Sequence, residues 1–376
     1  MRSLLAGLVL AHALVFGGVA VASPPLRFDE RVIGQVEGFP TDIAIARLNA
    51  GRRPDLVVAV QVSGTEPGGV QVALNRFGGF RLQPFVQGGV TPYRVGVGDL
   101  DNDGDTDVVV PNTVSEDLTV FGNDGAGGLA VTATPAVPYL TRGIAVANVI
   151  GDWRPDVVTS STDDPDGSTS ASLRILPAGD GPPVTVPADE PFSPAESIVA
   201  VDLNRDGRRD LAAVDLSGVF VAYRTAAGFE PARRVASVED LPFDIAAGDL
   251  NGDGLTDLAT ANLIGARVAV LLRRRDNSGF EPPRYVDAGA GSAHIAIADF
   301  DGDCRNDVAV SLLDAGKVAV IRGARRGAFH PAQHYDAGPV PLALATADFD
   351  GDGDPDLAVA NRDSQELRLL VNRGRR

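Results

Sequence analysis

One acidic nine-residue motif, repeated along the chain at a nearly fixed spacing, constrains the fold more than any other feature. It has the form D-x-D-x-D-G-x-x-D between two apolar runs, and it starts at seven places that are 47 to 54 residues apart. A fixed period of this length is typical of repeat architectures, in which each unit is one supersecondary element that stacks on its neighbours. The seven first positions are Arg47, Asp99, Asn148, Asp202, Asp249, Asp299 and Asp348.

Each unit contains short segments that are typical of β-strands. In the second unit, runs rich in Val, Thr and Phe cover residues 94–98, 107–110, 118–121 and 129–137, with Gly, Asp and Asn between them. After the first residues, no segment keeps a 3.6-residue apolar period for three turns, so the predicted class is all-β. Four strands in each of seven units predict a seven-bladed β-propeller of four-stranded blades.

The two ends of the chain predict how the ring closes. The last unit stops after its third strand, at residues 367–372, whereas residues 28–38 resemble the fourth strands at 80–89 and 280–289. We therefore expect the N-terminal segment to complete the last blade. Closure matters because an open ring would leave strand edges with unpaired backbone groups.

The first residues predict export. Arg2 precedes an apolar run over residues 4–21, and Ala20-Val21-Ala22 supplies a cleavage site for a signal peptide. The alternative is a membrane anchor, since the run is long enough to cross a bilayer, but the cleavage site favours removal. The prediction is a signal peptide at 1–22 and a single propeller over 23–376, without membrane insertion after cleavage. We expect the protein to be secreted, periplasmic or associated with the cell surface.

Charge and cysteine content narrow the function further. The net charge of −17 argues against nucleic acid as a partner, because nucleic acids select basic surfaces. Cys304 is the single cysteine, so no internal disulfide can form and another device must stabilise an exported fold. The expected role of Cys304 is that of a free structural cysteine.

The acidic motif has the chemistry of a calcium loop. A calcium ion takes six to eight oxygen ligands at about 2.3–2.6 Å. In a tight loop, side chains at positions one, three, five and nine and the backbone carbonyl at position seven can converge on one ion. Solvated acidic turns are the alternative, but five such loops at equivalent points favour metal binding. The five predicted sites, for up to five Ca²⁺ with a structural role, are Asp99/Asp101/Asp103/Asp105/Asp107, Asp202/Asn204/Asp206/Arg208/Asp210, Asp249/Asn251/Asp253/Leu255/Asp257, Asp299/Asp301/Asp303/Arg305/Asp307 and Asp348/Asp350/Asp352/Asp354/Asp356.

Not all seven loops are equivalent. Cys304 replaces the glycine of position six in the loop that starts at Asp299, so a left-handed turn there is strained and the site is expected to be the weakest or bent differently. Two loops have lost their ligands and are predicted to bind no metal. The first has Arg47, Asn49, Gly51 and Asp55, and Arg47 is expected to place its own cation where calcium would lie; the third has Asn148, Ile150, Asp152 and Asp156.

The loops resemble those of a known family. The segment DFDGDGDPDL at 348–357 is similar to the calcium loop of FG-GAP/VCBS repeats, the blades of integrin α-chain propellers and of many bacterial exported proteins. The resemblance covers about residues 28–372 and implies calcium on one face, in the loops between the first and second strands of a blade. Within this family the fold most often serves adhesion or ligand binding, and some relatives are lectins or polysaccharide lyases.

The sequence contains no recognised catalytic motif. His330 and His334 are either a two-histidine metal site or exposed polar residues, and the second interpretation is favoured. A single tryptophan, Trp153, weakens the prediction of a lectin. The loop at 160–172 is expected to be flexible decoration on the face opposite the calcium loops.

A ring of equivalent residues is expected around the channel mouth on that opposite face. It could bind a polar ligand or be a solvated rim, which is the preferred interpretation. Its members are Asp42, Arg94, Gly143, Ser197, Asp244, His294 and Ala343. Together these features predict a non-enzymatic scaffold that binds a protein or glycan partner; the alternative is a calcium-stabilised lectin or a polysaccharide lyase.

Overall fold

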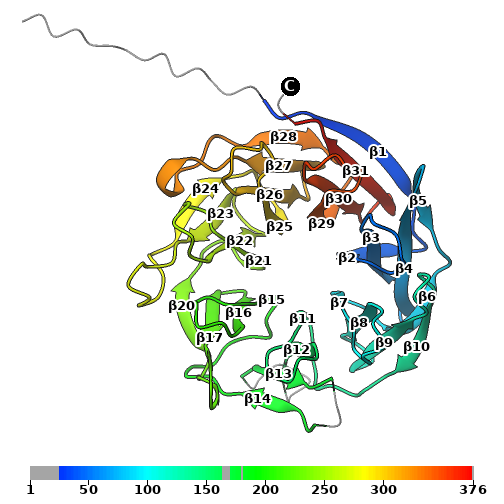
Figure 1. Cartoon of the computed structure of the whole chain (residues 1–376), viewed down its shortest axis with the longest axis horizontal. Coiled ribbons are helices and arrows are strands. Elements are labelled where there is room, and N and C mark those ends of the chain that lie inside the picture. The colour runs from blue at the N-terminus through cyan, green and yellow to red at the C-terminus, as the bar shows by residue number, and fades with distance from the viewer. Residues whose placement is uncertain (1–24, 163–169, 179–180, 375–376) are drawn as a thin grey trace, which may run out of the picture.

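Seven antiparallel sheets surround a central axis in the computed structural model (Figure 1), which describes residues 25–162, 170–178 and 181–374. The predicted all-β, seven-bladed propeller is therefore confirmed. The predicted signal peptide and most of the 160–172 loop lie outside the described residues. In the part of the chain that the structure describes, no helix has the length and apolar character needed to cross a membrane.

The first three blades follow the predicted units. Blade 1 contains β2 (Phe39–Ala46), β3 (Asp55–Gln61), β4 (Pro67–Arg76) and an outer strand in two pieces, β5 (Gly79–Leu82) and β6 (Val86–Val90), which both pair with β4. Blade 2 contains β7 (Gly96–Gly98), β8 (Asp107–Asn112), β9 (Asp117–Asn123) and β10 (Leu129–Ala133). Blade 3 contains β11 (Ile144–Ala147), β12 (Asp156–Ser161), β13 (Ser172–Leu176) and β14 (Val184–Val186).

Blades 4 to 6 repeat the pattern. Blade 4 contains β15 (Ser197–Val201), β16 (Asp210–Asp215), β17 (Gly218–Ala222) and β20 (Arg233–Ser237), with a small hairpin of β18 (Arg224–Thr225) and β19 (Gly228–Phe229). Blade 5 contains β21 (Pro242–Gly248), β22 (Asp257–Asn262), β23 (Arg267–Leu271) and β24 (Arg284–Asp287). Blade 6 contains β25 (Ser292–Ala298), β26 (Asp307–Leu312), β27 (Lys317–Ile321) and β28 (Gln333–Asp336), and a short 3-10 turn covers Arg325–Gly327.

Blade 7 is built from both ends of the chain. It contains β29 (Pro341–Ala347), β30 (Asp356–Asn361), β31 (Glu366–Asn372) and, as its outer strand, β1 (Phe28–Gln35). The β1–β31 pairing is antiparallel and runs from Phe28 opposite Asn372 to Gln35 opposite Glu366. Figure 1 shows the blue N-terminal strand lying along the red C-terminal strand. The predicted closure of the ring by the N-terminal segment is confirmed.

The second strand is buried along its whole length in six of the seven blades. The six are β8, β12, β16, β22, β26 and β30. These strands lie in the middle of a blade, so both of their faces are covered by neighbouring blades, and an apolar run suits them better than strict alternation.

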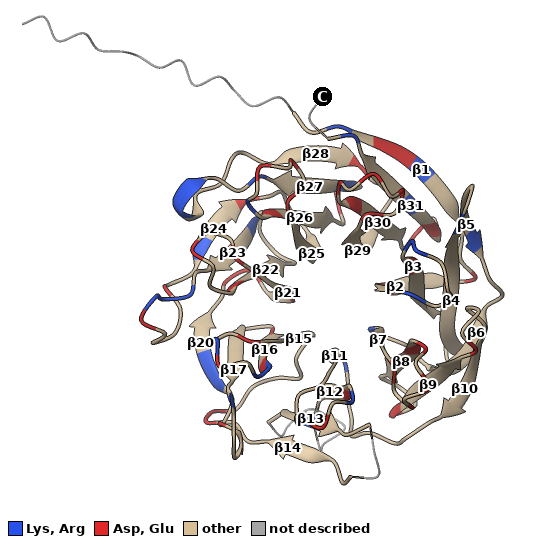
Figure 2. Cartoon of the chain, viewed as in Figure 1, with Lys and Arg blue, Asp and Glu red and all other residues tan. Residues whose placement is uncertain are grey.

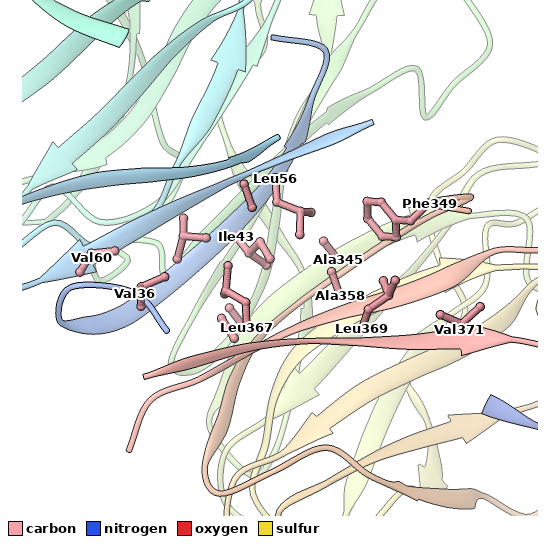
Figure 3. Packing of buried hydrophobic residues seen from close by; sticks show 14 residues of the cluster. Val36, Ile43, Leu56, Val60, Ala345, Phe349, Ala358, Leu367, Leu369 and Val371 are labelled. Atoms are coloured by element: carbon pink, nitrogen blue, oxygen red, sulfur yellow. The ribbon is translucent and has the colours of Figure 1, made fainter. Parts of the chain in front are cut away.

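The core lies between neighbouring blades. Figure 3 shows the apolar cluster between blades 1 and 7. Ile43 and Leu56 of blade 1 belong to the same cluster as Ala345, Ala358 and Leu369 of blade 7. Small alanines on the inner strands leave room for the larger side chains opposite them, which permits close packing of the two sheets. The closure of the ring therefore rests on apolar burial as well as on the β1–β31 hydrogen bonds.

Candidate metal centres

The acidic loops join the first and second strands of their blades, as the sequence predicted, and Figure 2 shows acidic residues gathered in several of them. In all five predicted loops the backbone N–H of position six donates to the carboxylate of position one. Gly104 N, for example, lies 3.1 Å from Asp99 Oδ2, and Cys304 N lies 2.8 Å from Asp299 Oδ2. The first aspartate therefore shapes its own loop.

Position six has a left-handed backbone, as its glycine suggested. Gly104 has a φ of 95°, and Cys304 has a φ of 63° at the same place. The predicted strain at Cys304 is thus confirmed in its backbone conformation, because a residue with a Cβ pays a steric cost there. Trp153, at position six of the third loop, also has a positive φ, of 75°, which the sequence analysis did not predict.

Three of the five loops bring carboxylates together. Within each group, oxygens from three aspartates all lie within 4.8 Å of one another. This spacing fits a shared calcium ion, since ligands on opposite sides of an ion at about 2.4 Å are about 4.8 Å apart. The groups are Asp99/Asp101/Asp107, Asp299/Asp301/Asp303 and Asp348/Asp350/Asp356.

Two carboxylate oxygens in these groups show that a cation fits. Asp99 Oδ1 and Asp350 Oδ1 are buried and accept no hydrogen bond. A buried anionic oxygen without a donor is costly, and a metal ion is the partner that removes this cost without a proton. The donor set contains only oxygen, which suits calcium better than a softer metal.

The structure differs from the prediction at position five of the last loop. Asp352 was expected to converge with the other ligands, but it is exposed and does not belong to the group formed by positions one, three and nine. The physical reason is a local turn, in which Asp352 Oδ1 accepts the backbone N–H of Asp354 at 3.1 Å. Asp103 in blade 2 also lies outside its group, and its Oδ1 accepts Asp105 N at 2.9 Å. In both loops the position-five carboxylate is therefore a turn-forming residue, and its role as a metal ligand stays a prediction.

The loop that starts at Asp299 gathers its carboxylates differently. Its group uses Asp303 from position five, whereas the other two groups use the aspartate of position nine. Asp307, at position nine of this loop, was predicted as a ligand but lies outside the group. This difference agrees with the expectation that the Cys304 loop is bent differently.

The remaining two loops share the frame but not the acidic group. Asn204 Oδ1 and Asn251 Oδ1 each accept a backbone N–H, from Asp206 and Asp253 respectively, at 2.9 Å. The same bond joins Asp103 N to Asp101 Oδ1 at 3.1 Å in the second blade. The predicted ligand sets of the loops in blades 4 and 5 include an amide oxygen. Neither of these two loops forms a three-carboxylate group among the described residues. The residues that stay outside such a group are Asp202, Asp206 and Asp210 in blade 4 and Asp249, Asp253 and Asp257 in blade 5.

Position seven also takes part in the loop frame. Its backbone N–H donates to the carboxylate of position five in all five loops, at 2.9 to 3.1 Å. The residues concerned are Asp105, Arg208, Leu255, Arg305 and Asp354, which the sequence nominated through their carbonyl oxygens. The carbonyl role itself stays a prediction.

The aspartate of position nine is a brace that occurs in all seven blades. Asp107, which is buried, accepts Leu100 N at 2.8 Å on Oδ2 and Asn123 N at 3.0 Å on Oδ1. Both blades that lack the other ligands keep this residue, as Asp55 and Asp156. The sequence contained the signal for a structural role, because these two aspartates persist where no metal is expected.

Burial controls the protonation of these braces. It raises the pKa of Asp307 to about 7 and that of Asp356 to about 6, although backbone N–H donors oppose the shift. The same cause raises the pKa of Asp55, where no acidic group surrounds the carboxylate. A nearby positive charge would therefore stabilise the ionised form of these position-nine carboxylates.

In blades 1, 2 and 7, an asparagine side chain connects the blade to the acidic-motif loop of the preceding blade. Asn123, whose backbone N–H binds Asp107, also donates from Nδ2 to Leu48 O in blade 1, at 3.1 Å. Asn75 makes the same link to Phe349 O at 2.8 Å, and Asn372 makes it to Phe300 O at 2.7 Å. These loops therefore take part in the contacts between blades.

In the first loop, a side-chain amide contacts the position-nine aspartate. Asn49 Nδ2 donates to Asp55 Oδ2 at 2.7 Å, whereas Arg47 is exposed. The guanidinium of Arg47 was expected to occupy the place of calcium, but the neutral amide of Asn49 contacts Asp55 instead. In the third loop, Asn148 Oδ1 accepts Gly151 N at 2.8 Å, so a side chain–backbone bond shapes this turn as well.

The predicted ring near the axis is a buried charged cluster. Arg94 Nη1 lies 3.4 Å from Asp244 Oδ1, 3.8 Å from Asp42 Oδ1 and 3.0 Å from His294 Nε2. Each of these four residues is at most 8% exposed. The preferred interpretation as a solvated rim is wrong, because all seven ring positions are buried.

The cluster fixes the charge of its members. Burial, aided by the Arg94 cation, lowers the pKa of His294 to about 3, so the imidazole is neutral and can accept a hydrogen bond from Arg94. Burial raises the pKa of Asp42 to about 6 against the attraction of Arg94. At neutral pH one guanidinium therefore faces two carboxylates and a neutral histidine.

Glu196 extends the cluster toward the surface. Tyr93 donates its hydroxyl hydrogen to Glu196 Oε2 at 2.6 Å, and Arg142 Nη1 lies 2.5 Å from Glu196 Oε1. Burial, together with the negative charge of Glu196, raises the pKa of Tyr93, so its hydroxyl stays protonated. Glu196 was not among the residues predicted from the sequence to form the ring.

His330 and His334 lie outside the acidic groups of the described residues. Across the described ranges, the groups of three or more His, Cys, Asp and Glu residues that are close enough to share a metal ion are the three acidic groups. Neither His330 nor His334 belongs to one of them. His334 Nε2 lies 2.8 Å from Ala288 O, which is a structural contact between blades 5 and 6. Cys304 is a free, exposed thiol.

Comparison with known proteins identifies the repeat. No curated protein is a detectable relative of this sequence. The crystal structure of BBS1N in complex with ARL6DN, soaked with lead, is similar in fold, with a TM-score of 0.61 over 92% of this chain and 96% of that chain. Its sequence identity of 11% supports the shared fold alone. The FG-GAP-like repeat matches residues 48–110, 202–260, 249–310 and 299–359, which is more than half of the chain. The chain belongs to the FG-GAP-like repeat family.

Proposed function

We propose that the protein is an exported calcium-binding propeller that serves as a non-enzymatic binding or adhesion scaffold for a protein or glycan partner. The observation that carries the calcium part is the unpartnered, buried oxygen of Asp99 and of Asp350 inside groups of three carboxylates. These carboxylates lie on loops that also hold the links between blades. Calcium would therefore stabilise the ring that presents the binding surface.

Calcium would act mainly on stability. Carboxylates held within 4.8 Å repel one another when no cation is bound, and this repulsion disfavours the folded state. An ion that binds only the folded chain adds a stabilisation of about 2.7 kcal/mol when its concentration is 100 times Kd. Such support suits an exported chain whose single cysteine excludes an internal disulfide.

The structural contacts of the buried aspartates support a non-enzymatic scaffold. Asp42 and Asp244 bind backbone N–H groups of the next blade, Val95 at 2.9 Å and Ile295 at 3.0 Å, and both lie beside Arg94. The position-nine aspartates are equally engaged by backbone donors. These aspartates are thus engaged in structural contacts, between blades for Asp42 and Asp244 and within a blade for the position-nine residues, which favours a scaffold.

Export is proposed from the N-terminal apolar run and its Ala20-Val21-Ala22 site. A glycan-active protein is the second candidate. Two exposed aromatic side chains, those of Phe77 and Trp153, support it, since aromatic rings can stack on sugars.

An array experiment tests the proposed function. Protein comprising residues 23–376 would be applied to arrays of glycans and of extracellular proteins in millimolar calcium, and the arrays would be repeated with chelator. Circular dichroism would verify the fold in both buffers. Saturable, calcium-dependent binding without release of unsaturated sugars supports a scaffold. Release of unsaturated products, seen by ultraviolet absorbance, would show a lyase instead, and folded protein that binds nothing on either array contradicts the proposal.

A further inference from the structure

Blade 1 carries a basic groove on the face of the metal loops. The groove has a volume of about 540 Å³ and lies between the first loop, the β4–β5 turn and the β9–β10 turn of blade 2. Its lining includes three arginines and no acidic residue, although the protein has a net charge of −17. The basic and aromatic side chains of the lining are Arg52, Arg53, Arg76 and Phe77.

The arginines of this groove have no acidic partner at contact distance. Among the described residues, none of Arg52, Arg53 and Arg76 forms a salt bridge. Arg76 Nη2 donates to Ala126 O at 3.4 Å, and the Arg76 charge also acts on the buried carboxylate of Asp55. Some arginines beside the acidic loops are paired instead, although Arg205 and Arg209 form no salt bridge among the described residues. Arg208 lies 3.2 Å from Asp206 and Arg373 lies 3.3 Å from Asp350. The cations of the groove are therefore available to an external anion.

The loss of metal ligands and the gain of cations occur in the same loop. Asn49 and Gly51 stand where the calcium loops have acidic residues, and Asn49 already satisfies Asp55. No ion is needed to hold this loop, so the arginines that follow it can serve another purpose. Arg53 extends toward blade 7, where its Nε lies 3.6 Å from the place that a Cβ on Gly351 would occupy.

Phe77 adds an apolar contact at the edge of the groove. Its side chain is fully exposed at the tip of the β4–β5 turn, directly after Arg76. An aromatic ring that projects into water beside unpaired arginines is typical of a binding surface rather than of a core. The flat face of a phenyl ring suits the apolar face of a pyranose, and an arginine fork suits a carboxylate.

The basic surface continues across the boundary between blades 7 and 1. Arg53 and Asn75 also line a second groove of about 510 Å³, together with Arg31 and Phe80. Its one acidic residue, Asp350, is paired with Arg373. Two adjoining open grooves that share Arg53 suit an extended chain with repeated charges better than a single small anion.

We infer that the basic groove of blade 1 binds an acidic polysaccharide. Carboxylates of the sugar chain would lie on Arg52, Arg53 and Arg76, and one pyranose would stack on Phe77. The inference rests on the proposed scaffold function and names the class of glycan. Phe77 favours a sugar over an acidic peptide, because a peptide of Asp and Glu offers no apolar face to the ring.

A titration tests this inference. Fluorescently labelled hyaluronate octasaccharide would be titrated with protein of residues 23–376 in calcium buffer at low salt, with fluorescence anisotropy as the readout. A carboxyl-reduced octasaccharide and a poly-glutamate peptide of equal charge serve as comparison ligands. We expect saturable binding of the acidic sugar that weakens as sodium chloride is added, and at least about tenfold weaker binding of the neutral sugar, which corresponds to about 1.4 kcal/mol.

Variants locate the site. We expect the double variant Arg52→Ser/Arg53→Ser to weaken binding by about tenfold or more, since it removes two charge-assisted contacts, and Phe77→Ser to weaken it several-fold. Arg81→Ser removes an exposed arginine of the same blade outside both groove linings, and Trp153→Ser removes an exposed aromatic residue of blade 3. Both controls should bind like the parent.

Three outcomes would overturn the inference. They are folded parent protein that does not bind the acidic octasaccharide, binding unchanged in the double variant, and tighter binding of poly-glutamate than of the sugar. The last outcome would assign the groove to an acidic protein. Because the array experiment samples many other ligands, the scaffold function can survive any of these results.

Discussion

Arg94 of blade 2 lies 3.4 Å from Asp244 of blade 5, so one ion pair crosses the axis of the ring. The same guanidinium donates to Glu196 O and Phe243 O, at 3.1 Å each. Asp244 in turn accepts the backbone N–H of Ile295 in blade 6. A single side chain therefore connects blades that are far apart in the sequence, at the end of the ring where the first strands begin.

Removal of the Arg94 charge should destabilise the fold strongly. We expect Arg94→Leu to lower the free energy of unfolding by about 3–5 kcal/mol, because two buried carboxylates lose their cation. Urea denaturation at pH 7.5 measures this loss. A triple variant with Asp42→Asn and Asp244→Asn should recover part of it, and a loss below about 1 kcal/mol for Arg94→Leu alone would show that the cluster contributes little.

His294 should remain neutral well below its ordinary pKa of 6.5. Burial first, and the Arg94 cation second, lower its pKa to about 3. Its long-range ¹H–¹⁵N spectrum is therefore expected to show no titration between about pH 7 and pH 4. A titration midpoint near 6.5 would contradict the buried cluster.

The same shift gives a pH dependence to stability. A histidine whose folded pKa is lowered contributes stability above about pH 6.5 that is lost as the pH falls toward 3. Asp42, with a raised pKa of about 6, opposes this trend, because its contribution is present at low pH and lost as the pH rises through 6. Comparison with His294→Gln isolates the histidine: the stability difference between parent and variant should fall by about 2 kcal/mol from pH 6.5 to pH 4.5.

The repeat made the fold predictable, while the networks between blades were not. The period of about fifty residues and the strand-like 28–38 segment predicted both the blade count and the closure by β1, and the D-x-D pattern predicted the acidic groups. The double role of Asp107, as brace and as member of a metal group, is not visible in spacing alone. Spacing also does not show that Asp352 turns toward the backbone of its own loop. Pairing of Arg94 with Asp244 depends on which strands face each other across the ring, and a repeat period does not specify that.

The brace and the metal ligand can be separated by mutation. Asp55→Asn should lower the free energy of unfolding by about 1–3 kcal/mol, because the backbone N–H groups of Leu48 and Asn75 lose an anionic acceptor. The loss should be the same with calcium and with chelator, since this loop is predicted to bind no ion. Asp101→Asn, in an acidic group, should be destabilising in calcium and nearly neutral in chelator. Thermal unfolding of both variants in both buffers gives the comparison, and an Asp55→Asn effect that disappears in chelator would be evidence against the brace.

Cys304→Gly should stabilise the protein. Glycine removes the steric cost of a φ of 63°, which is about 1–2 kcal/mol. Glycine also makes the unfolded chain more flexible, which offsets part of this stabilisation. A net gain of up to about 1 kcal/mol is expected in urea denaturation. Cys304→Ser keeps the strain and should leave the stability unchanged, so equal effects of the two variants would argue against backbone strain.

Metal content measured together with thermal stability shows whether the acidic loops bind calcium and whether calcium stabilises the ring. Protein comprising residues 23–376 would be dialysed against dilute calcium, analysed by mass spectrometry for bound metal, and then melted before and after chelation. Calcium binding by the acidic loops predicts three to five calcium ions per chain, since three acidic groups are assembled and five loops have the motif. It also predicts that the melting temperature falls by several degrees after chelation. A protein that retains no calcium, or that melts at the same temperature after verified removal of its metal, would contradict it.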